Sequence, residues 1–167
     1  MKKILSLTLA LAMLGTALTG CGSKTAAPET SVEPTQQTAP YQQEQSQTEK
    51  ALALINTFAT GDTDTASSLL SDGYIQHNLA YGTGADAFIG SVEYLASADV
   101  KTTVNNIRAF EDGDKVFLQT IYNFAGAGEQ VAFDIFRFDE DGKIAEHWDV
   151  METIADQSTW QNQNGKF

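Results

Sequence analysis

The segment FDIFRFDEDGKIAEHWDV (residues 133–150) has the pattern of two β-strands joined by a tight turn. Apolar residues alternate with polar ones on both sides of DEDG, which is a typical turn sequence. The pattern also contains ionisable residues where core side chains are expected. Asp134 lies inside the first strand, and His147 and Asp149 flank Trp148 in the second. Because an unpaired charge is costly to bury, these groups are the first candidates for a functional site.

Two further strands are predicted before this segment, at residues 100–110 and 115–124. The turn sequences EDGD and AGAGE separate them from each other and from the strand at 130–138, and the last strand is expected at 143–151. Turn signals at regular intervals predict an antiparallel meander.

Three helices are predicted before the strands. Apolar residues at helical spacing mark residues 47–60 and 85–97, and Gly61 ends the first of these helices. A short helix is expected at 64–71, with Thr63 or Asp64 as its cap, and residues 72–84 are expected to form a loop. Helices followed by a meander indicate an α+β domain, with the helices packed on one face of a strongly curved antiparallel sheet. Such packing would close a cone-shaped pocket.

The first 20 residues are expected not to belong to the fold. Two lysines precede an apolar run that is too short to span a membrane comfortably, and the run leads to LTGC, ending at Cys21. This layout is typical of a secretory signal peptide. The sequence LTGC resembles the lipobox of bacterial lipoproteins, which implies lipidation of Cys21 and an extracytoplasmic protein anchored to the cell membrane by its N-terminal lipid. The alternative is a secreted protein with an unmodified cysteine.

Composition supports a tethered domain. Residues 21–46 contain all three prolines and many Ser, Thr, Ala and Gln residues, so we expect a disordered tether there and a folded domain at 47–167. A net charge of −12 disfavours nucleic acid as a partner. Cys21 is the single cysteine, which excludes intrachain disulfides and thiol-based catalysis in the domain.

Two motifs carry a family resemblance. YIQHN (residues 74–78) and VAFDIFRFDEDGKIAEHWDV (131–150) resemble the SnoaL-like branch of the nuclear transport factor 2-like superfamily. The resemblance extends over about residues 50–156. It implies an α+β cone with one pocket, often in a dimer. Members include polyketide cyclases, ketosteroid isomerase relatives, epoxide hydrolases, dehydratases and binding modules, so the resemblance indicates the fold better than the activity.

Asp134 is the main catalytic candidate. It shares its strand face with Ala132, Phe136 and Phe138, and a carboxyl group in such an apolar setting can act as a general acid or base. The alternative is a carboxylate paired with a basic group or a backbone amide. On the preceding strand we expect Gln119 or Thr120 opposite Asp134. The resembled family often has histidine near the Gln119 position, so a His–Asp pair of the polyketide cyclase type is not expected between these two strands.

The turn at residues 139–142 decides which side chains accompany Asp134. A two-residue turn pairs it with Asp149, a four-residue loop with His147, and a three-residue loop with Trp148. A slip of one residue exchanges the two faces of a strand. Either His147 and Asp149 enter the pocket, or Glu146 and Trp148 do. The need of a large aromatic side chain for burial favours Trp148 inside.

His77 is the second catalytic candidate, because in the resembled family the YIQHN segment lies near the pocket mouth. The alternative is a histidine that braces its loop. No spacing typical of a metal site, a phosphate-binding loop or a serine nucleophile is present, so we expect no metal and no cofactor. The residues expected to bind ligand are Tyr74, Gln119, Tyr122, Phe136, His147, Trp148 and Asp149.

Three functions fit this sequence. The first is a lipid-anchored pocket domain that binds a small, partly apolar ligand. The second is an enzyme of the isomerase, cyclase or dehydratase type, with Asp134 as general acid or base and His77 or His147 assisting. The third is a protein-interaction module of the cell envelope. Apolar residues on the outer strand face (Val131, Phe133, Ile135) further suggest a homodimer.

Overall fold

The computed structural model describes residues 44–167. The predicted signal peptide, Cys21 and most of the predicted tether lie outside the described residues. No helix in the described part of the chain is both long enough and apolar enough to cross a membrane.

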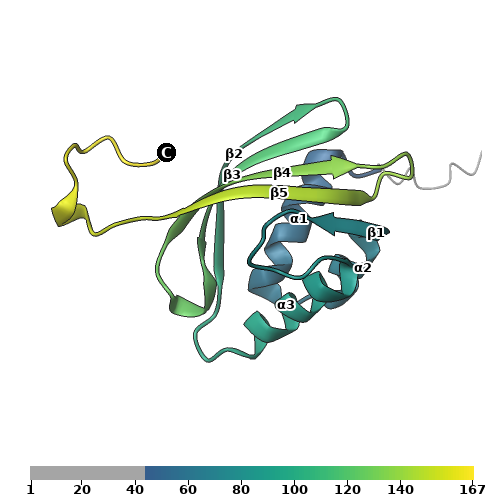
Figure 1. Cartoon of the computed structure of the whole chain (residues 1–167), viewed down its shortest axis with the longest axis horizontal. Coiled ribbons are helices and arrows are strands. Elements are labelled where there is room, and N and C mark those ends of the chain that lie inside the picture. The colour runs from purple at the N-terminus through teal and green to yellow at the C-terminus, as the bar shows by residue number, and fades with distance from the viewer. Residues whose placement is uncertain (1–43) are drawn as a thin grey trace, which may run out of the picture. The chain divides into compact units, whose positions relative to one another are not determined.

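Three helices form one layer of the domain (Figure 1). Helix α1 (Gln47–Thr60) begins with a capping box, in which Ser46 and Glu49 each accept a backbone N–H from the other, and ends at Gly61. Helix α2 (Thr63–Leu69) is capped by Asp62, not by Thr63 or Asp64 as expected. Helix α3 (Ala85–Ser97) completes the layer.

The second layer is a five-stranded sheet with the order β1-β5-β4-β3-β2. Its strands are β1 (Leu70–Gln76), β2 (Thr103–Asp112), β3 (Lys115–Asn123), β4 (Gln130–Phe138) and β5 (Ile144–Thr153). The predicted antiparallel meander is confirmed for β2 to β5. The predicted loop at 72–84 is wrong in its first part, because β1 pairs with β5 in parallel (Figure 1). The α+β class is therefore confirmed, with a mixed sheet.

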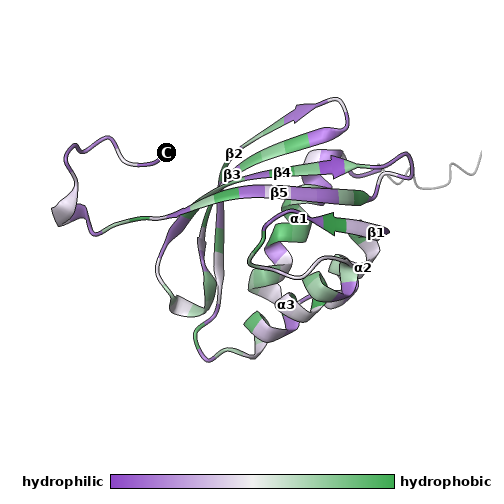
Figure 2. Cartoon of the chain, in the orientation of Figure 1, coloured by the Kyte–Doolittle hydropathy of each residue, from purple (hydrophilic) through white to green (hydrophobic). Residues whose placement is uncertain are grey.

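All three helices pack on one face of the sheet (Figure 1). No helix of this layer covers the other face, where Gln119, Ile121 and Val131 are nevertheless buried. Hydrophobic residues mark strands β3 and β4 and helix α1 (Figure 2). Between the layers lies a core whose largest fully buried side chains are Leu54, Ile55, Val92, Val116, Leu118, Phe136 and Ile144.

The β4–β5 connection sets the register of the site. Asp139 Oδ1 accepts the backbone N–H groups of Asp141 and Lys143, which closes a five-residue loop over residues 139–143. The pairing then shifts, because Phe138 lies opposite Ile144 whereas Arg137 lies opposite Glu146. This irregularity restores the register of a two-residue turn and places Asp134 opposite Asp149. His147 and Asp149 therefore face inward, and the preference for Trp148 inside was wrong.

The β3–β4 connection also differs from expectation. It is longer than a simple hairpin turn and contains the short helix η1 (Phe124–Gly126). Asp134 consequently lies opposite Leu118, and Gln119 lies opposite Phe133 on the outer face. Neither Gln119 nor Thr120 is the partner of Asp134, so that prediction was wrong. Gln119 is buried there and donates to the backbone oxygen of Lys166 in the C-terminal segment.

Candidate functional site

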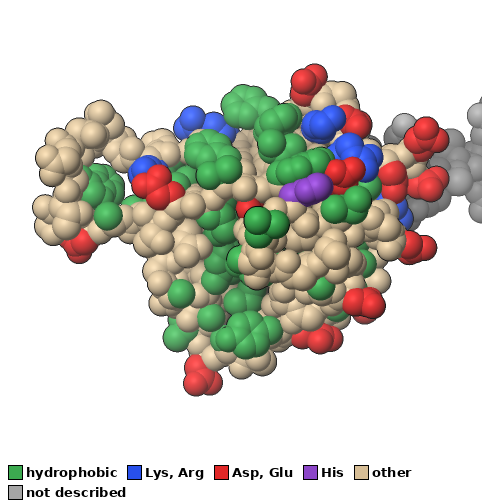
Figure 3. All heavy atoms as spheres, viewed as in Figure 1, with side chains coloured by type: hydrophobic (Ala, Val, Ile, Leu, Met, Phe, Trp, Pro, Cys, Tyr) green, Lys and Arg blue, Asp and Glu red, His purple; other side chains and the backbone are tan. Residues whose placement is uncertain are grey.

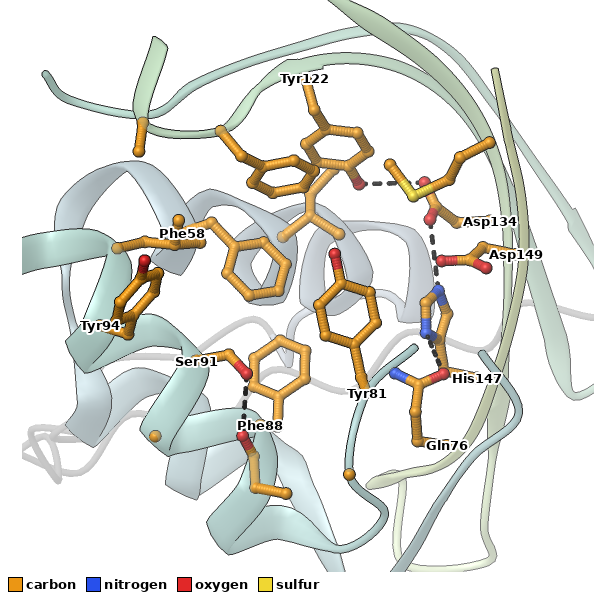
Figure 4. Close-up of a pocket in the computed structure, with 18 of the residues that line it drawn as sticks. Phe58, Gln76, Tyr81, Phe88, Ser91, Tyr94, Tyr122, Asp134, His147 and Asp149 are labelled. Atoms are coloured by element: carbon orange, nitrogen blue, oxygen red, sulfur yellow. Dashed lines mark hydrogen bonds and ion pairs between the residues drawn. The ribbon is translucent and has the colours of Figure 1, made fainter. Parts of the chain in front are cut away.

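A cavity of about 600 Å³ lies between the helices and the inner face of the sheet. This volume is in the range of small-molecule sites in proteins. Figure 4 shows Gln76, Asp134, His147 and Asp149 on one wall, and Phe58 and Tyr94 on the side away from them. The cavity therefore has a polar wall on the sheet and an apolar wall on the helices. Aromatic lining residues are Phe58, Tyr81, Phe88, Tyr94, Tyr122, Phe124 and Phe136.

Asp134 and His147 form the centre of the polar wall. Adjacent antiparallel strands β4 and β5 carry them, and His147 Nε2 lies 3.2 Å from Asp134 Oδ1. The other carboxylate oxygen of Asp134 accepts the hydroxyl of Tyr122 at 3.0 Å. Asp134 is 4% exposed and His147 is 7% exposed. A buried His–Asp pair is therefore present, but its histidine lies on β5. Between β3 and β4 no such pair forms, as expected, because Leu118 lies opposite Asp134.

The hydrogen-bond partners of Gln76 fix the tautomer of His147. Gln76 Oε1 accepts the backbone N–H of Asn78 at 2.9 Å, and its Nε2 donates to the Tyr74 hydroxyl at 3.2 Å. The amide oxygen therefore faces His147 Nδ1, at 3.1 Å. Because an amide oxygen only accepts, Nδ1 must carry the hydrogen.

With Nδ1 protonated, the hydrogen bond between His147 Nε2 and Asp134 needs one further proton, on either side chain. If Nε2 carries it, the pair is an imidazolium and a carboxylate; if Asp134 carries it, the pair is a neutral imidazole and a carboxylic acid. In both forms one mobile proton joins the two side chains. The arrangement can accept or donate a proton at the cavity wall without moving a heavy atom.

Asp149 is the third ionisable group of the polar wall. Asn78 Nδ2 donates to both of its carboxylate oxygens, at 2.8 and 2.9 Å. Asn78 is itself held by the N–H of Ala80, which donates to its Oδ1, and by its own N–H, which donates to Gln76. Gln76 at the end of β1 thus positions His147, and Asn78 just after β1 positions Asp149.

Three tyrosines surround this wall and stay protonated. Burial raises the pKa of Tyr122, and the charge of Asp134 raises it further. Burial likewise raises the pKa of Tyr74, with the charges of Asp149 and Asp134 adding to the effect, and burial and Asp149 raise that of Tyr81. The phenols can therefore donate hydrogen bonds near neutral pH.

The same polar wall offers donor atoms for a metal ion. One ligand atom each from Asp134, His147 and Asp149 lies within 4.8 Å of the others. Imidazole and carboxylates are common ligands of divalent ions. A proton shared between Asp134 and His147 would occupy two of these ligand atoms without a metal. That the site holds no metal stays a prediction.

Two predicted site residues, His77 and Trp148, lie outside the cavity on the outer side of the sheet. His77 stacks on Trp148, with ring centroids 4.6 Å apart and planes 4° apart, and its Nε2 lies 3.1 Å from Glu146 Oε2. Glu146 in turn binds Arg137, which lowers the pKa of its carboxyl. This cluster lies on the outer side of β5, because Glu146 and Trp148 alternate with His147 and Asp149. The structure thus corrects the placement of His77 and Trp148 in the pocket.

The remaining predicted ligand-binding residues divide in two groups. Tyr122, Phe136, His147 and Asp149 line the cavity together with Asp134. Gln119 lies on the outer face, and Tyr74 is buried behind the wall, where it holds Gln76. The sequence prediction missed Gln76 and Asn78 as positioning residues. Gln76 is the last residue of β1, and Asn78 lies just beyond it, so recognising β1 would have placed both beside β5.

Comparisons with known proteins agree with this architecture. The sequence profile of a SnoaL-like domain matches residues 51–147. No curated protein sequence matches the chain significantly.

Solved structures with the same fold are distant in sequence. An NTF2-like protein of unknown function from Cytophaga hutchinsonii is 16% identical, with a TM-score of 0.57 over 66% of this chain and 94% of that one. An LEH-like epoxide hydrolase from M. tuberculosis is 18% identical (TM-score 0.54; 62% and 80% covered). IdmH from Streptomyces antibioticus, a candidate polyketide cyclase, is 17% identical (TM-score 0.52; 65% and 93% covered). At these identities the similarity concerns the fold alone.

Proposed function

The chain belongs to the SnoaL-like domain family, and we propose that its cavity binds a small, partly apolar molecule on which the Asp134–His147 pair transfers a proton. The observation that carries this proposal is the hydrogen-bonded chain Gln76–His147–Asp134–Tyr122 on the cavity wall. A buried ionisable pair that is fully oriented and open to a cavity is typical of acid–base sites.

The reaction class follows from what the wall contains. Asp134 removes a proton from a carbon or hydroxyl group of the bound molecule while His147 holds the proton between them, and the pair can return a proton to another atom of the same molecule. Tyr122 donates to Asp134 and keeps its carboxyl oriented. Isomerisation, cyclisation and dehydration all need such steps. A candidate polyketide cyclase and an epoxide hydrolase share the fold, which supports small-molecule chemistry in the cavity without selecting the reaction.

Deuterium exchange tests the proton transfer without knowledge of the natural ligand. β-Tetralone is an apolar ketone with exchangeable α-hydrogens, and the full chain should accelerate their exchange in D₂O. Asp134→Asn should lower the protein-catalysed rate by about 10²–10⁴-fold, the usual contribution of a positioned acid or base. Asp141→Asn removes an acid from the β4–β5 loop outside the cavity and serves as the matched control. Equal rates for the wild type and Asp134→Asn would contradict the proposal.

We also propose that the domain acts outside the cytoplasmic membrane, anchored through a lipid on Cys21. The support is the sequence of the first 21 residues, with its basic start, apolar run and LTGC. Cys21→Ser should release the protein from the membrane fraction into the medium. Retention of this variant in the membrane fraction would count against lipidation.

The outer sheet face supports a homodimer as part of this proposal. Phe110, Phe117, Ile135 and Trp148 lie directly opposite one another across β2 to β5 and form an apolar row. Hydrophobic side chains gather on the face of the molecule in Figure 3, and Phe133 beside this row is 54% exposed. Exposed apolar patches of this kind mark interaction surfaces. Sedimentation should give a dimer that Phe133→Glu converts to a monomer; a monomeric wild type at micromolar concentration would exclude the dimer.

A further inference from the structure

The charge of the cavity is unbalanced. Among the described residues that line it, two are carboxylic acids (Asp134 and Asp149), one is a histidine (His147), and none is lysine or arginine. Asp134 shares its proton with His147. With one proton between them, Asp134 and His147 together carry no net charge, so the charge of Asp149 leaves the cavity wall negative overall.

The carboxylate of Asp149 is held in place but has hydrogen-bond acceptor positions left. Its partner Asn78 is a neutral amide that donates one hydrogen bond to each carboxylate oxygen. Each carboxylate oxygen can accept two hydrogen bonds, so one acceptor position on each oxygen is left for another donor. Asp149 is partly exposed to solvent, and a ligand that displaces water from the cavity can supply the hydrogen bonds that the wall does not.

The field of Asp149 extends into the cavity. Its charge contributes to the raised pKa of Tyr81, a cavity-lining residue, and of Tyr74 behind the wall. Both tyrosines remain neutral, so they do not compensate the carboxylate. An anionic ligand would be repelled by the same field, whereas a cation would be attracted.

The apolar wall also suits a cation with an apolar body. Seven aromatic side chains line the cavity, and ring faces attract ammonium groups. Phe58 and Phe88 lie with ring centroids 4.9 Å apart, and Phe58 and Phe124 lie 5.7 Å apart in an edge-to-face arrangement. Such a wall favours a ring-containing hydrocarbon body.

We propose that the cavity selects a protonated amine with an apolar ring body, whose ammonium group binds Asp149 while the ring packs on the aromatic wall. A primary ammonium has three donors, enough for the free acceptor position on each oxygen of Asp149. This inference rests on the proposed ligand-binding function of the cavity and adds the substrate class to it. Asp149 then acts in specificity, and the Asp134–His147 pair remains free for proton transfer.

Calorimetric titration of the full chain with three probes of similar shape tests the selection. Naphthylmethylamine is protonated at neutral pH, naphthylmethanol is neutral and naphthoate is anionic. EDTA in every titration keeps metal ions away from Asp134, His147 and Asp149. The amine should bind about tenfold to a hundredfold tighter than the alcohol, as expected for hydrogen bonds to a charged group, and naphthoate should bind weakest.

Two variants assign this preference to one side chain. Asp149→Asn should bring the amine and the alcohol to similar affinities while binding of the alcohol is retained. Asp141→Asn removes the same charge from the exposed loop and should keep the preference. The inference is overturned if the alcohol binds the wild type as tightly as the amine, or if Asp149→Asn keeps the preference. Failure of all three probes to bind would instead overturn the proposed ligand-binding function itself.

Discussion

Each face of the β4–β5 pair carries a histidine next to a carboxylate, but the inner pair is buried and the outer pair is partly exposed. On the inner face, His147 meets Asp134 beside Asp149, where Asp134 and His147 are buried. On the outer face, His77 meets Glu146 beside Arg137, with side chains that are 20–39% exposed. Exposed pairs contribute little to stability, whereas buried ones are costly unless they are fully satisfied or used. The comparison explains why we assign chemistry to the inner group and bracing to the outer one.

Replacing each histidine by alanine should show the largest difference between the two faces. His147→Ala removes one partner of a buried pair and the ring that stacks on Phe136 at 4.5 Å, so it should lower the free energy of unfolding by about 3 kcal/mol or more. His77→Ala should cost about 1 kcal/mol or less. Urea denaturation of both variants measures the difference. Equal losses in the free energy of unfolding would show that burial does not make the inner cluster more important for stability than the outer one.

The loop between β4 and β5 should have an intermediate effect. Asp139→Ala removes the carboxylate that accepts the N–H groups of Asp141 and Lys143, so we expect a loss of about 1 kcal/mol. If the loop alone set the register, this variant would also exchange the two faces of β5. We expect instead that the sheet pairing keeps His147 inside, because a slip would place Glu146 in the core. Intact deuterium exchange of β-tetralone by this variant checks that expectation.

The outer ion pair should give the smallest effect, with a defined pH dependence. Arg137 lowers the pKa of Glu146 below its ordinary value of 4.5. A carboxyl with a lowered pKa in the folded state stabilises the protein above its unfolded pKa, and this stabilisation is lost as the pH falls through the folded pKa. Glu146→Gln should therefore cost about 0.5 kcal/mol at pH 7 and progressively less below the ordinary pKa of glutamate. A constant difference down to low pH would contradict this origin.

The sequence predicted those parts of the fold that local patterns determine. Turn sequences and alternation gave the four antiparallel strands, and helical spacing gave α1 and α3. Strand β1 was missed because Ser71, Asp72 and Gly73 give it a loop-like composition, and its pairing with the distant β5 stabilises it.

The candidate site was predicted in part for a related reason. Asp134 was identified from its apolar strand face, but its neighbours depend on two connections that are longer than standard turns. The irregularity between Arg137 and Phe138 moves His147 to the inner face, and local sequence does not reveal it. Trp148 satisfies its need for burial differently, by stacking on His77 outside the cavity. Burial preference alone therefore gave the wrong face.

The protonation of the His147 ring tests the central claim most directly. ¹⁵N NMR of the full chain distinguishes protonated from bare ring nitrogens, and His77 gives an internal comparison on the outer face. We predict that Nδ1 of His147 stays protonated throughout the pH range in which the protein is folded, because Gln76 Oε1 only accepts. The mobile proton should then reside on Nε2 or on Asp134. A neutral His147 with a bare Nδ1 and a protonated Nε2 would contradict the account.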